Sequence, residues 1–315
     1  MAGATQGDRR MSAARIASLL PSVTEIACAL GLADRLVARS HECDYPPEVE
    51  RLPAVTAGRL PADAVTQAQV DDAVTQAARD GEALYDVDGA LLASLAPDLV
   101  LTQSLCDVCA VDEDTVRRAL GHMQPPAALL SLAPGRLDEV VDSVGDVAHA
   151  AGVEDRGEAL MGALRARLDA VARRVAGRPR VRVAAVEWLD PPWSAGHWVP
   201  DQVAAAGGEE VLIAPGSRSA RITWEDLAAA RPDVVVLMPC GLSLAEVREL
   251  AQLVPPLGVR VAAVDASGLF SRPGPRLVDG VEVLAHMLHP LPGDPPPGDA
   301  WAWVDAPSGY TRSGR

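Results

Sequence analysis

Short apolar runs alternate with segments of helical periodicity along most of the chain. Runs such as Leu99-Val100-Leu101 and Val234–Met238 lie between segments in which apolar residues recur every three or four positions. This alternation predicts an α/β fold in which helices connect parallel strands. The predicted strands are 15–19, 34–39, 98–102, 127–131, 181–186, 234–238 and 259–264, and the predicted helices are 21–30, 67–80, 90–95, 115–120, 137–151, 155–175, 201–206, 224–230, 244–253 and 275–288.

The helix predicted over 155–175 is the longest. At 1.5 Å per residue, about 20 residues would make a rod of roughly 30 Å, the width of a domain. The phrase 92–100 is similar to the phrase 227–235, since each reads as a short helix, Pro-Asp and a buried strand. We therefore predict two Rossmann-like lobes joined by one long backbone helix, with a ligand cleft between the lobes. The predicted divisions are a disordered N-terminus (1–14), an N-terminal α/β lobe (15–135), a helical linker containing the long helix (136–177), a C-terminal α/β lobe (178–290) and a largely disordered Pro/Gly-rich tail (291–315).

Local signals place several boundaries. Ser22 followed by Glu25 predicts a capping box at the start of the first helix, and Gly31 predicts its end. The Pro-rich segment 191–200 is expected to be a loop. The helix predicted over 67–80 is read either as a flap over the cleft or as a helical insertion on the surface.

Composition and charge exclude some classes of partner. The formal net charge of −15 over 315 residues argues against nucleic acid and against anionic lipid, because no basic patch is present. No window approaches the roughly 18 apolar residues of a membrane span, so membrane insertion is not expected. The first 15 residues contain no apolar core typical of a secretory signal. A cytoplasmic location is therefore expected, in which the five cysteines are reduced.

Four of the cysteines follow predicted strands. In an open α/β sheet, these turns face the ligand crevice. Cys43 lies beside His41, Cys106 and Cys109 form a C-x2-C pair, and Cys240 follows the strand 234–238. This thiol set could hold Zn²⁺ or an iron–sulfur cluster. The alternative is that the thiols are reduced and packed at strand ends.

Other polar and aromatic residues are expected at the same turns. Glu187 and Trp188 end the first strand of the second half, and Trp188 is a candidate ligand-binding residue. Glu187 could ligate a metal, act as a base together with His41, or hydrogen-bond a loop. His197 is a candidate ligand or acid, with a structural loop histidine as the alternative. Arg272 and Arg276 could bind an anionic ligand group or form salt bridges to a helix.

A set of short phrases in a fixed order resembles the substrate-binding proteins that have a rigid helical backbone, and most closely the cobalamin-binding, BtuF-like components of importers. The resemblance covers about residues 15–290. It implies a ligand held between two lobes that move little, with Tyr45, Trp193, Phe270 and Arg276 lining the cleft. The phrases are 18–25, 44–47, 96–100, 190–193, 202–203, 207–208, 231–233 and 270–276.

The chain departs from this family in features that concern transport. The family docks to its transporter through one Glu on each lobe, and Glu225 matches the second position whereas Ala90 occupies the first. Together with the missing export signal, this predicts no docking to a transporter.

Two hypotheses follow. The first is a soluble cytoplasmic BtuF-like protein that binds a corrinoid, such as cobalamin, or another metal-containing ligand. The second is a metalloenzyme on the same scaffold, in which a Cys-ligated Zn²⁺ or iron–sulfur cluster and the pair Glu187 and His41 act on a small molecule. The sequence leaves open whether the protein is an enzyme.

Overall fold

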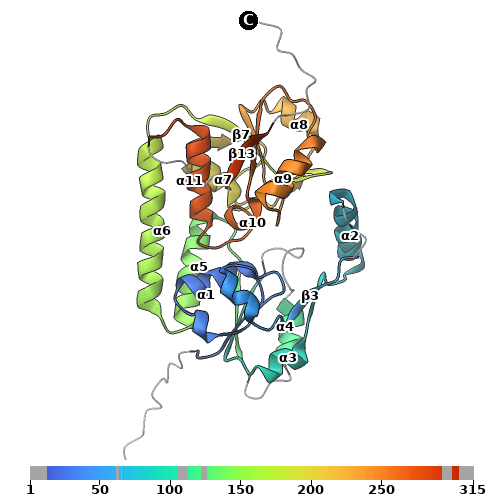
Figure 1. The fold of residues 1–315 in the computed structure, drawn as a ribbon, viewed down its shortest axis with the longest axis vertical. Coiled ribbons are helices and arrows are strands. Elements are labelled where there is room, and N and C mark those ends of the chain that lie inside the picture. The colour runs from blue at the N-terminus through green and yellow to red at the C-terminus, as the bar shows by residue number, and fades with distance from the viewer. Residues whose placement is uncertain are drawn as a thin grey trace, which may run out of the picture. The chain divides into compact units, whose positions relative to one another are not determined.

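A computed structural model describes residues 13–61, 64, 66–104, 113–121, 126–292 and 300–304. The chain forms two compact units (Figure 1). Both are α/β, which confirms the predicted fold class. The division is interrupted along the sequence: unit 1 contains residues 1–58, 85–132 and 143–161, and unit 2 contains residues 59–84, 133–142 and 162–315.

Unit 1 is built on a parallel sheet with the strand order β2-β1-β5-β6. A separate antiparallel pair, β3 and β4, lies beside the segment that carries His41. The strands are β1 (Ile16–Ser18), β2 (Leu36–Ala38), β3 (Thr56–Gly58), β4 (Tyr85–Val87), β5 (Leu99–Gln103) and β6 (Ala128–Leu132), and the helices are α1 (Pro21–Ala29), η1 (Ala33–Arg35), η2 (Pro47–Arg51), α3 (Gly89–Ser94) and α4 (Glu113–Leu120).

Unit 2 is built on a mixed sheet in which β9, β7, β11 and β12 are parallel and β8, β10 and β13 are antiparallel to their neighbours. The strands are β7 (Val181–Leu189), β8 (Pro192–Ser194), β9 (Gly208–Glu210), β10 (Ala220–Arg221), β11 (Val234–Leu237), β12 (Arg260–Val264) and β13 (Trp301–Val304). The helices are α2 (Gln67–Asp80), α7 (Val199–Ala205), α8 (Trp224–Ala229), α9 (Leu244–Leu250), η3 (Ala251–Leu253), α10 (Ala266–Leu269) and α11 (Leu277–Leu288).

The predicted long helix is present as α6 (Glu154–Val175), preceded by α5 (Leu137–Ala150). Its 22 residues correspond to a length of ~33 Å. Figure 1 shows α6 as a straight helix. Close packing against α5 needs a glycine, because a Cβ on Gly157 would lie 2.5 Å from the Cβ of Ala148.

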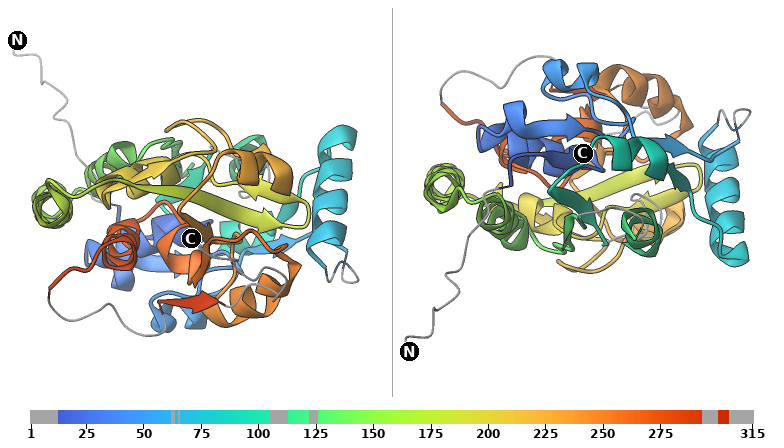
Figure 2. Two further views of the ribbon diagram at one scale, coloured as in Figure 1. Left: turned by 90° about the horizontal axis from the view of Figure 1, so that it is seen from above. Right: turned by 90° about the horizontal axis from the view of Figure 1, so that it is seen from below.

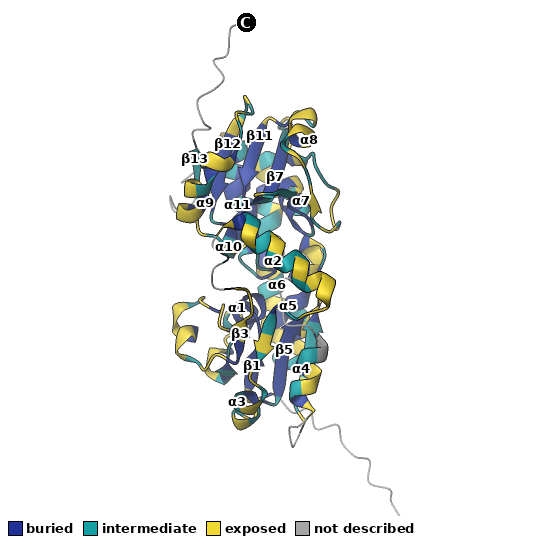
Figure 3. Cartoon of the chain, turned by 90° about the vertical axis from the view of Figure 1, so that its right-hand side faces the viewer, coloured by how far each residue is buried: buried dark blue, intermediate teal, exposed yellow. Residues whose placement is uncertain are grey.

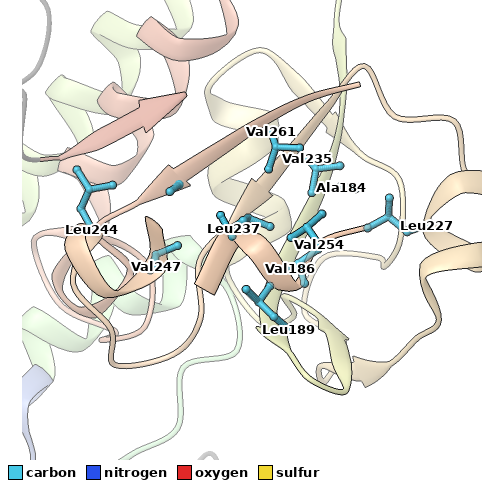
Figure 4. Packing of buried hydrophobic residues seen from close by; sticks show 12 residues of the cluster. Ala184, Val186, Leu189, Leu227, Val235, Leu237, Leu244, Val247, Val254 and Val261 are labelled. Atoms are coloured by element: carbon cyan, nitrogen blue, oxygen red, sulfur yellow. The ribbon is translucent and has the colours of Figure 1, made fainter. Parts of the chain in front are cut away.

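The core of each unit is aliphatic. In unit 2, Val186, Leu189 and Leu237 are at most 1% exposed, and Figure 4 shows them together with the other members of their cluster. In unit 1, Ala17, Leu92 and Val100 form the corresponding cluster. Among the described helices, none combines the length and the apolar character needed to cross a membrane.

The Pro-Asp repeat seen in the sequence is also a repeat of hydrogen bonds. In unit 1, Asp98 Oδ2 accepts from the backbone N–H of Arg15 at 3.0 Å. The guanidinium of Arg15 donates to the carbonyl oxygens of Leu95 and Ala96, at the end of α3. These bonds satisfy carbonyls that a helix end leaves without intrahelical donors.

Unit 2 repeats this arrangement. Asp233 Oδ2 accepts from the backbone N–H of Arg182 at 2.9 Å, and the Arg182 guanidinium donates to the carbonyls of Ala230 and Arg231. Ala96 and Arg231 both have a positive φ, of 41° and 49°. The two similar phrases therefore encode the same helix-to-strand junction in both units.

Several local predictions are wrong. Ser22 does not cap α1, whose N-cap is Leu20 with no side-chain cap. The segment 191–200 is not simply a loop, because it contains β8 and the start of α7. No strand was predicted in the tail, whereas Trp301–Val304 form β13, which pairs with β12.

The missed strands share a physical cause. β3, β4, β8, β9, β10 and β13 have two to four residues each, too few to show an alternating pattern. They are strands because of their partners in the sheet.

Candidate functional site

The carboxyl edge of the unit 1 sheet carries buried polar side chains. Thr24 Oγ1 donates to Ser18 Oγ at 2.6 Å and lies 3.0 Å from Cys43 Sγ. All three side chains are buried, and Cys43 is 1% exposed. Cys43 therefore belongs to a packed hydrogen-bonding network at the end of β1.

His41 lies on the neighbouring turn and is exposed. Its Nδ1 is 2.8 Å from Thr56 Oγ1, and that hydroxyl donates to Ser40 Oγ at 2.9 Å. The imidazole also packs against Tyr85, with ring centroids 5.8 Å apart. These contacts hold the ring in one orientation from its Nδ1 side. Tyr45, four residues along the chain, is 45% exposed.

The thiols do not form the predicted metal site within the described residues. Cys43 is in unit 1, whereas Cys240 is exposed just after β11 in unit 2. Cys106 and Cys109 lie outside the described residues. In the described part of the chain, no three His, Cys, Asp or Glu side chains are placed to hold a metal ion. The prediction of Zn²⁺ or an iron–sulfur cluster is therefore not supported.

The end of β7 in unit 2 carries Glu187 and Trp188. The pairing of β7 with β8 shifts register between Val186 and Trp188, so Glu187 lies in a β-bulge. Its carbonyl oxygen accepts from the backbone N–H of Cys240 at 3.0 Å. Trp188 and Trp193 are directly opposite each other on the two strands. The structure thus brings together two of the residues that the sequence assigns to ligand binding.

Helix α2 accepts a hydrogen bond from each of these tryptophans. Trp188 Nε1 donates to the carbonyl oxygen of Gln67 at 3.2 Å, and Trp193 Nε1 donates to Asp71 Oδ1 at 3.0 Å. Gln67 Oε1 accepts from the backbone N–H of Leu189 at 2.8 Å. The segment predicted as a flap or a surface insertion is therefore attached to the β7–β8 hairpin.

The loop from α10 to α11 carries the arginines. Arg276 packs over Gly268, where an added Cβ would lie 2.1 Å from its Nη1. Both Arg272 and Arg276 are partly buried. The Phe270 side chain is 2% exposed, and its carbonyl oxygen accepts from Trp198 Nε1 at 2.7 Å. The Phe270 ring therefore packs in the core of unit 2.

His197 lies in the loop between β8 and α7, with a φ of 55°. Its backbone N–H donates to the carbonyl of Ser217, and its ring packs against Trp198 with centroids 5.7 Å apart. Burial, and to a smaller extent the charge of Arg218, lowers the pKa of His197 below its ordinary value. Burial therefore favours the neutral form of the ring.

Sequence reasoning missed Gln67 and Asp71. They occupy polar positions of an ordinary amphipathic pattern, and their partners are more than 120 residues away along the chain. The sequence did offer one sign of these contacts, namely the two tryptophans themselves. A partly buried indole N–H usually needs an acceptor. That sign predicts an acceptor but does not say which one.

Comparison with known proteins gives one family. A family model described as "periplasmic binding protein" matches residues 16–252. The vitamin B12-binding protein of Vibrio cholerae serotype O1 is 24% identical over 281 residues, which cover 88% of this chain and 89% of that protein.

Solved structures agree on the fold. A periplasmic heme-binding protein from Pseudomonas aeruginosa has a TM-score of 0.69 at 21% identity, covering 94% of this chain and 100% of that one. The heme-binding protein BhuT, in complex with two hemes, has a TM-score of 0.63 at 26% identity, covering 87% and 97%. An ABC transporter substrate-binding protein from Listeria monocytogenes EGD-e has a TM-score of 0.64 at 16% identity, covering 88% and 98%. These likenesses confirm the predicted two-lobed α/β architecture with a long helix.

Proposed function

The chain belongs to the periplasmic binding protein family, and on this premise we propose that it binds a tetrapyrrole-type ligand, with a corrinoid as the first candidate. The observation that carries the proposal is the match of 281 residues to a vitamin B12-binding protein, which spans nearly the whole length of both proteins. This support is a likeness between whole chains and does not come from the site residues, so a binding measurement has to decide the ligand.

The chemistry of unit 2 supports a flat ligand with polar edges. The paired indoles of Trp188 and Trp193 offer apolar surface to a macrocycle, and their N–H groups are hydrogen-bond donors. Arg272 and Arg276 offer donors for acidic or amide groups at the rim of the ring. The assignments of Tyr45, His197 and Phe270 to ligand binding stay predictions.

Titration of the purified protein with cyanocobalamin tests the proposal. We expect one binding site with a Kd in the micromolar range or tighter, measured by calorimetry. The variant Trp193→Ala should weaken binding at least tenfold, because it removes aromatic contact area and a donor. Trp303→Ala, which removes a tryptophan on β13, is the matched control. Saturation absent up to millimolar cyanocobalamin would refute the corrinoid assignment.

Heme is the second candidate, favoured by the likeness to BhuT with its two bound hemes. If heme is the ligand, His41 is the residue that we propose to bind its iron. Its Nδ1 is engaged by Thr56, which leaves Nε2 as the coordinating atom. Hemin titration followed in the Soret band separates the candidates. A heme protein should show a Soret shift that His41→Ala changes, whereas a corrinoid protein should show no such shift.

The metalloenzyme alternative has no support. Among the described residues, no group of thiols, histidines or carboxylates is placed to hold the metal that it requires. The catalytic roles of Glu187 and His41 therefore remain sequence predictions.

The prediction that no transporter is involved is likewise not supported. One of the solved structures similar to this chain is an ABC transporter substrate-binding protein. The candidate docking residue Glu225 is exposed in the first turn of α8. We keep the cytoplasmic location as a proposal, which fractionation of cells expressing the full chain would test.

A further inference from the structure

Helix α2 occupies the hydrogen-bonding groups of both tryptophans at the β7–β8 hairpin. The indole N–H of Trp188 is bonded to Gln67, and that of Trp193 to Asp71. Figure 2 shows α2, in light blue, beside the yellow-green hairpin in both views. A ligand that uses these two donors has to compete with α2 for them.

The ends of α2 are capped by residues of its own segment, so the helix does not depend on the hairpin for its caps. Thr66 and Gln69 form a reciprocal capping box at its start, and Gly81, with a φ of 67°, ends it. Only Gln67 is buried among the residues of α2, and Figure 3 shows the rest of the helix as exposed or intermediate. Release of α2 from the hairpin would therefore break few contacts and no cap.

The position of α2 on the β7–β8 hairpin, which we call the docked position, leaves one polar group without a hydrogen bond. Gln67 is 7% exposed, and its Oε1 accepts from Leu189, but its buried Nε2 has no hydrogen-bond partner in the described structure. A buried donor without an acceptor destabilises the state that contains it. Three of the described hydrogen bonds thus stabilise the docked state of α2, and one buried donor without an acceptor destabilises it.

From these observations we propose that α2 is a releasable latch over Trp188 and Trp193, and that its release makes both indoles available to the ligand. The part concerning the ligand rests on the proposed function. The part concerning release does not, because it depends only on contacts within unit 2.

The first experiment needs no ligand. Solvent exchange of the indole N–H groups is measured by NMR in the full chain and in the variants Asp71→Ala and Asp72→Ala. Asp72 is the exposed neighbour on the same helix, so the two variants remove the same charge and add the same alanine. The indole of Trp198, bonded to the carbonyl of Phe270, is the internal reference.

Trp188 is the reporter, since Asp71→Ala leaves its own acceptor, the carbonyl of Gln67, in place. If α2 releases as a unit, Asp71→Ala should speed exchange at Trp188 roughly tenfold, as expected for loss of a hydrogen bond to a charged group. Asp72→Ala and the Trp198 signal should not change. Equal exchange rates of the Trp188 indole N–H in the two variants would overturn the proposal that α2 is a latch.

A second variant tests the same bond from the other side. Trp193→Phe removes the indole donor and keeps an aromatic ring, so it should raise exchange at Trp188 as much as Asp71→Ala does. The double variant should show no further rise, because both changes remove one interaction. Additive effects would contradict a direct role of this bond in holding α2.

The second experiment adds cyanocobalamin and measures its association rate by stopped flow. The Asp71→Ala variant should bind cyanocobalamin roughly tenfold faster than the Asp72→Ala variant, because α2 is released in a larger fraction of its molecules. Faster exchange with an unchanged association rate would overturn the gating role. Absence of binding in the unmodified chain would instead refute the proposed function, while the exchange data would still decide whether α2 releases.

Discussion

Glu210, at the end of β9, is a carboxylic acid used as a structural acceptor. Its Oε1 accepts from the backbone N–H of Leu212 at 2.8 Å, and its Oε2 accepts from that of Ala185 at 3.0 Å. Burial raises the pKa of Glu210 to about 8, although the backbone donors act in the opposite direction. This side chain therefore holds a proton in the folded protein at a pH where the unfolded chain has released it.

This difference gives a pH dependence with a definite sign. Because the folded pKa lies above the unfolded one, the stabilising contribution of Glu210 is present below about pH 4.5 and is lost as the pH rises toward 8. The free energy of unfolding should fall over this interval by at most about 1.4 kcal/mol per pH unit from this group. Urea denaturation at pH 5, 6.5 and 8 measures the slope.

Glu210→Gln should reduce that slope because the titrating group is gone. Glu209→Gln is the matched control, since Glu209 is the exposed neighbour on the same strand. Equal slopes for both variants would show that Glu210 does not carry the effect.

At the scale of the element, two helix glycines look alike in the sequence but differ in their surroundings. Gly162 lies within α6, and a Cβ there would meet nothing within 4 Å. Gly280 lies within α11, and a Cβ there would lie 2.3 Å from the carbonyl oxygen of Leu269. Close packing of α11 on the end of α10 therefore requires glycine at position 280.

Alanine at the two positions should act in opposite directions. Gly162→Ala should stabilise the protein by about 0.5–1 kcal/mol through helix propensity. Gly280→Ala should destabilise it by roughly 1–3 kcal/mol through overpacking. Chemical denaturation of both variants provides the comparison. Stabilisation by Gly280→Ala would mean that α11 and α10 are not in close contact.

For the molecule as a whole, ligand binding should appear as thermal stabilisation. A ligand at 100 times its Kd adds about 2.7 kcal/mol to the free energy of unfolding. For a chain of this size, we expect the melting temperature to rise by about 4–8 °C with saturating cyanocobalamin, and riboflavin serves as a control ligand. A melting temperature that is the same with both compounds would count against a corrinoid ligand.

Part of the candidate site could be predicted from the sequence. The sequence singles out Trp188, just after a predicted strand, and Trp193, in the Pro-rich segment 191–200, and the structure places these two tryptophans opposite each other. Their acceptors on α2 could not be predicted, because the segment around Gln67 carries no local sign of its partner. The thiol prediction had a similar weakness, since strand-end positions alone do not say whether side chains meet.

The amino-acid sequence by itself determined the α/β class, the long helix α6 and the repeated junctions at Asp98 and Asp233, because periodicity, glycine stops and Pro-Asp turns act over a few neighbouring residues. Only the tertiary structure decided that Trp301–Val304 is a strand and that α2 is attached to unit 2. Those outcomes depend on hydrogen bonds between segments far apart in the chain, and such bonds form only where folding brings an acceptor to a donor.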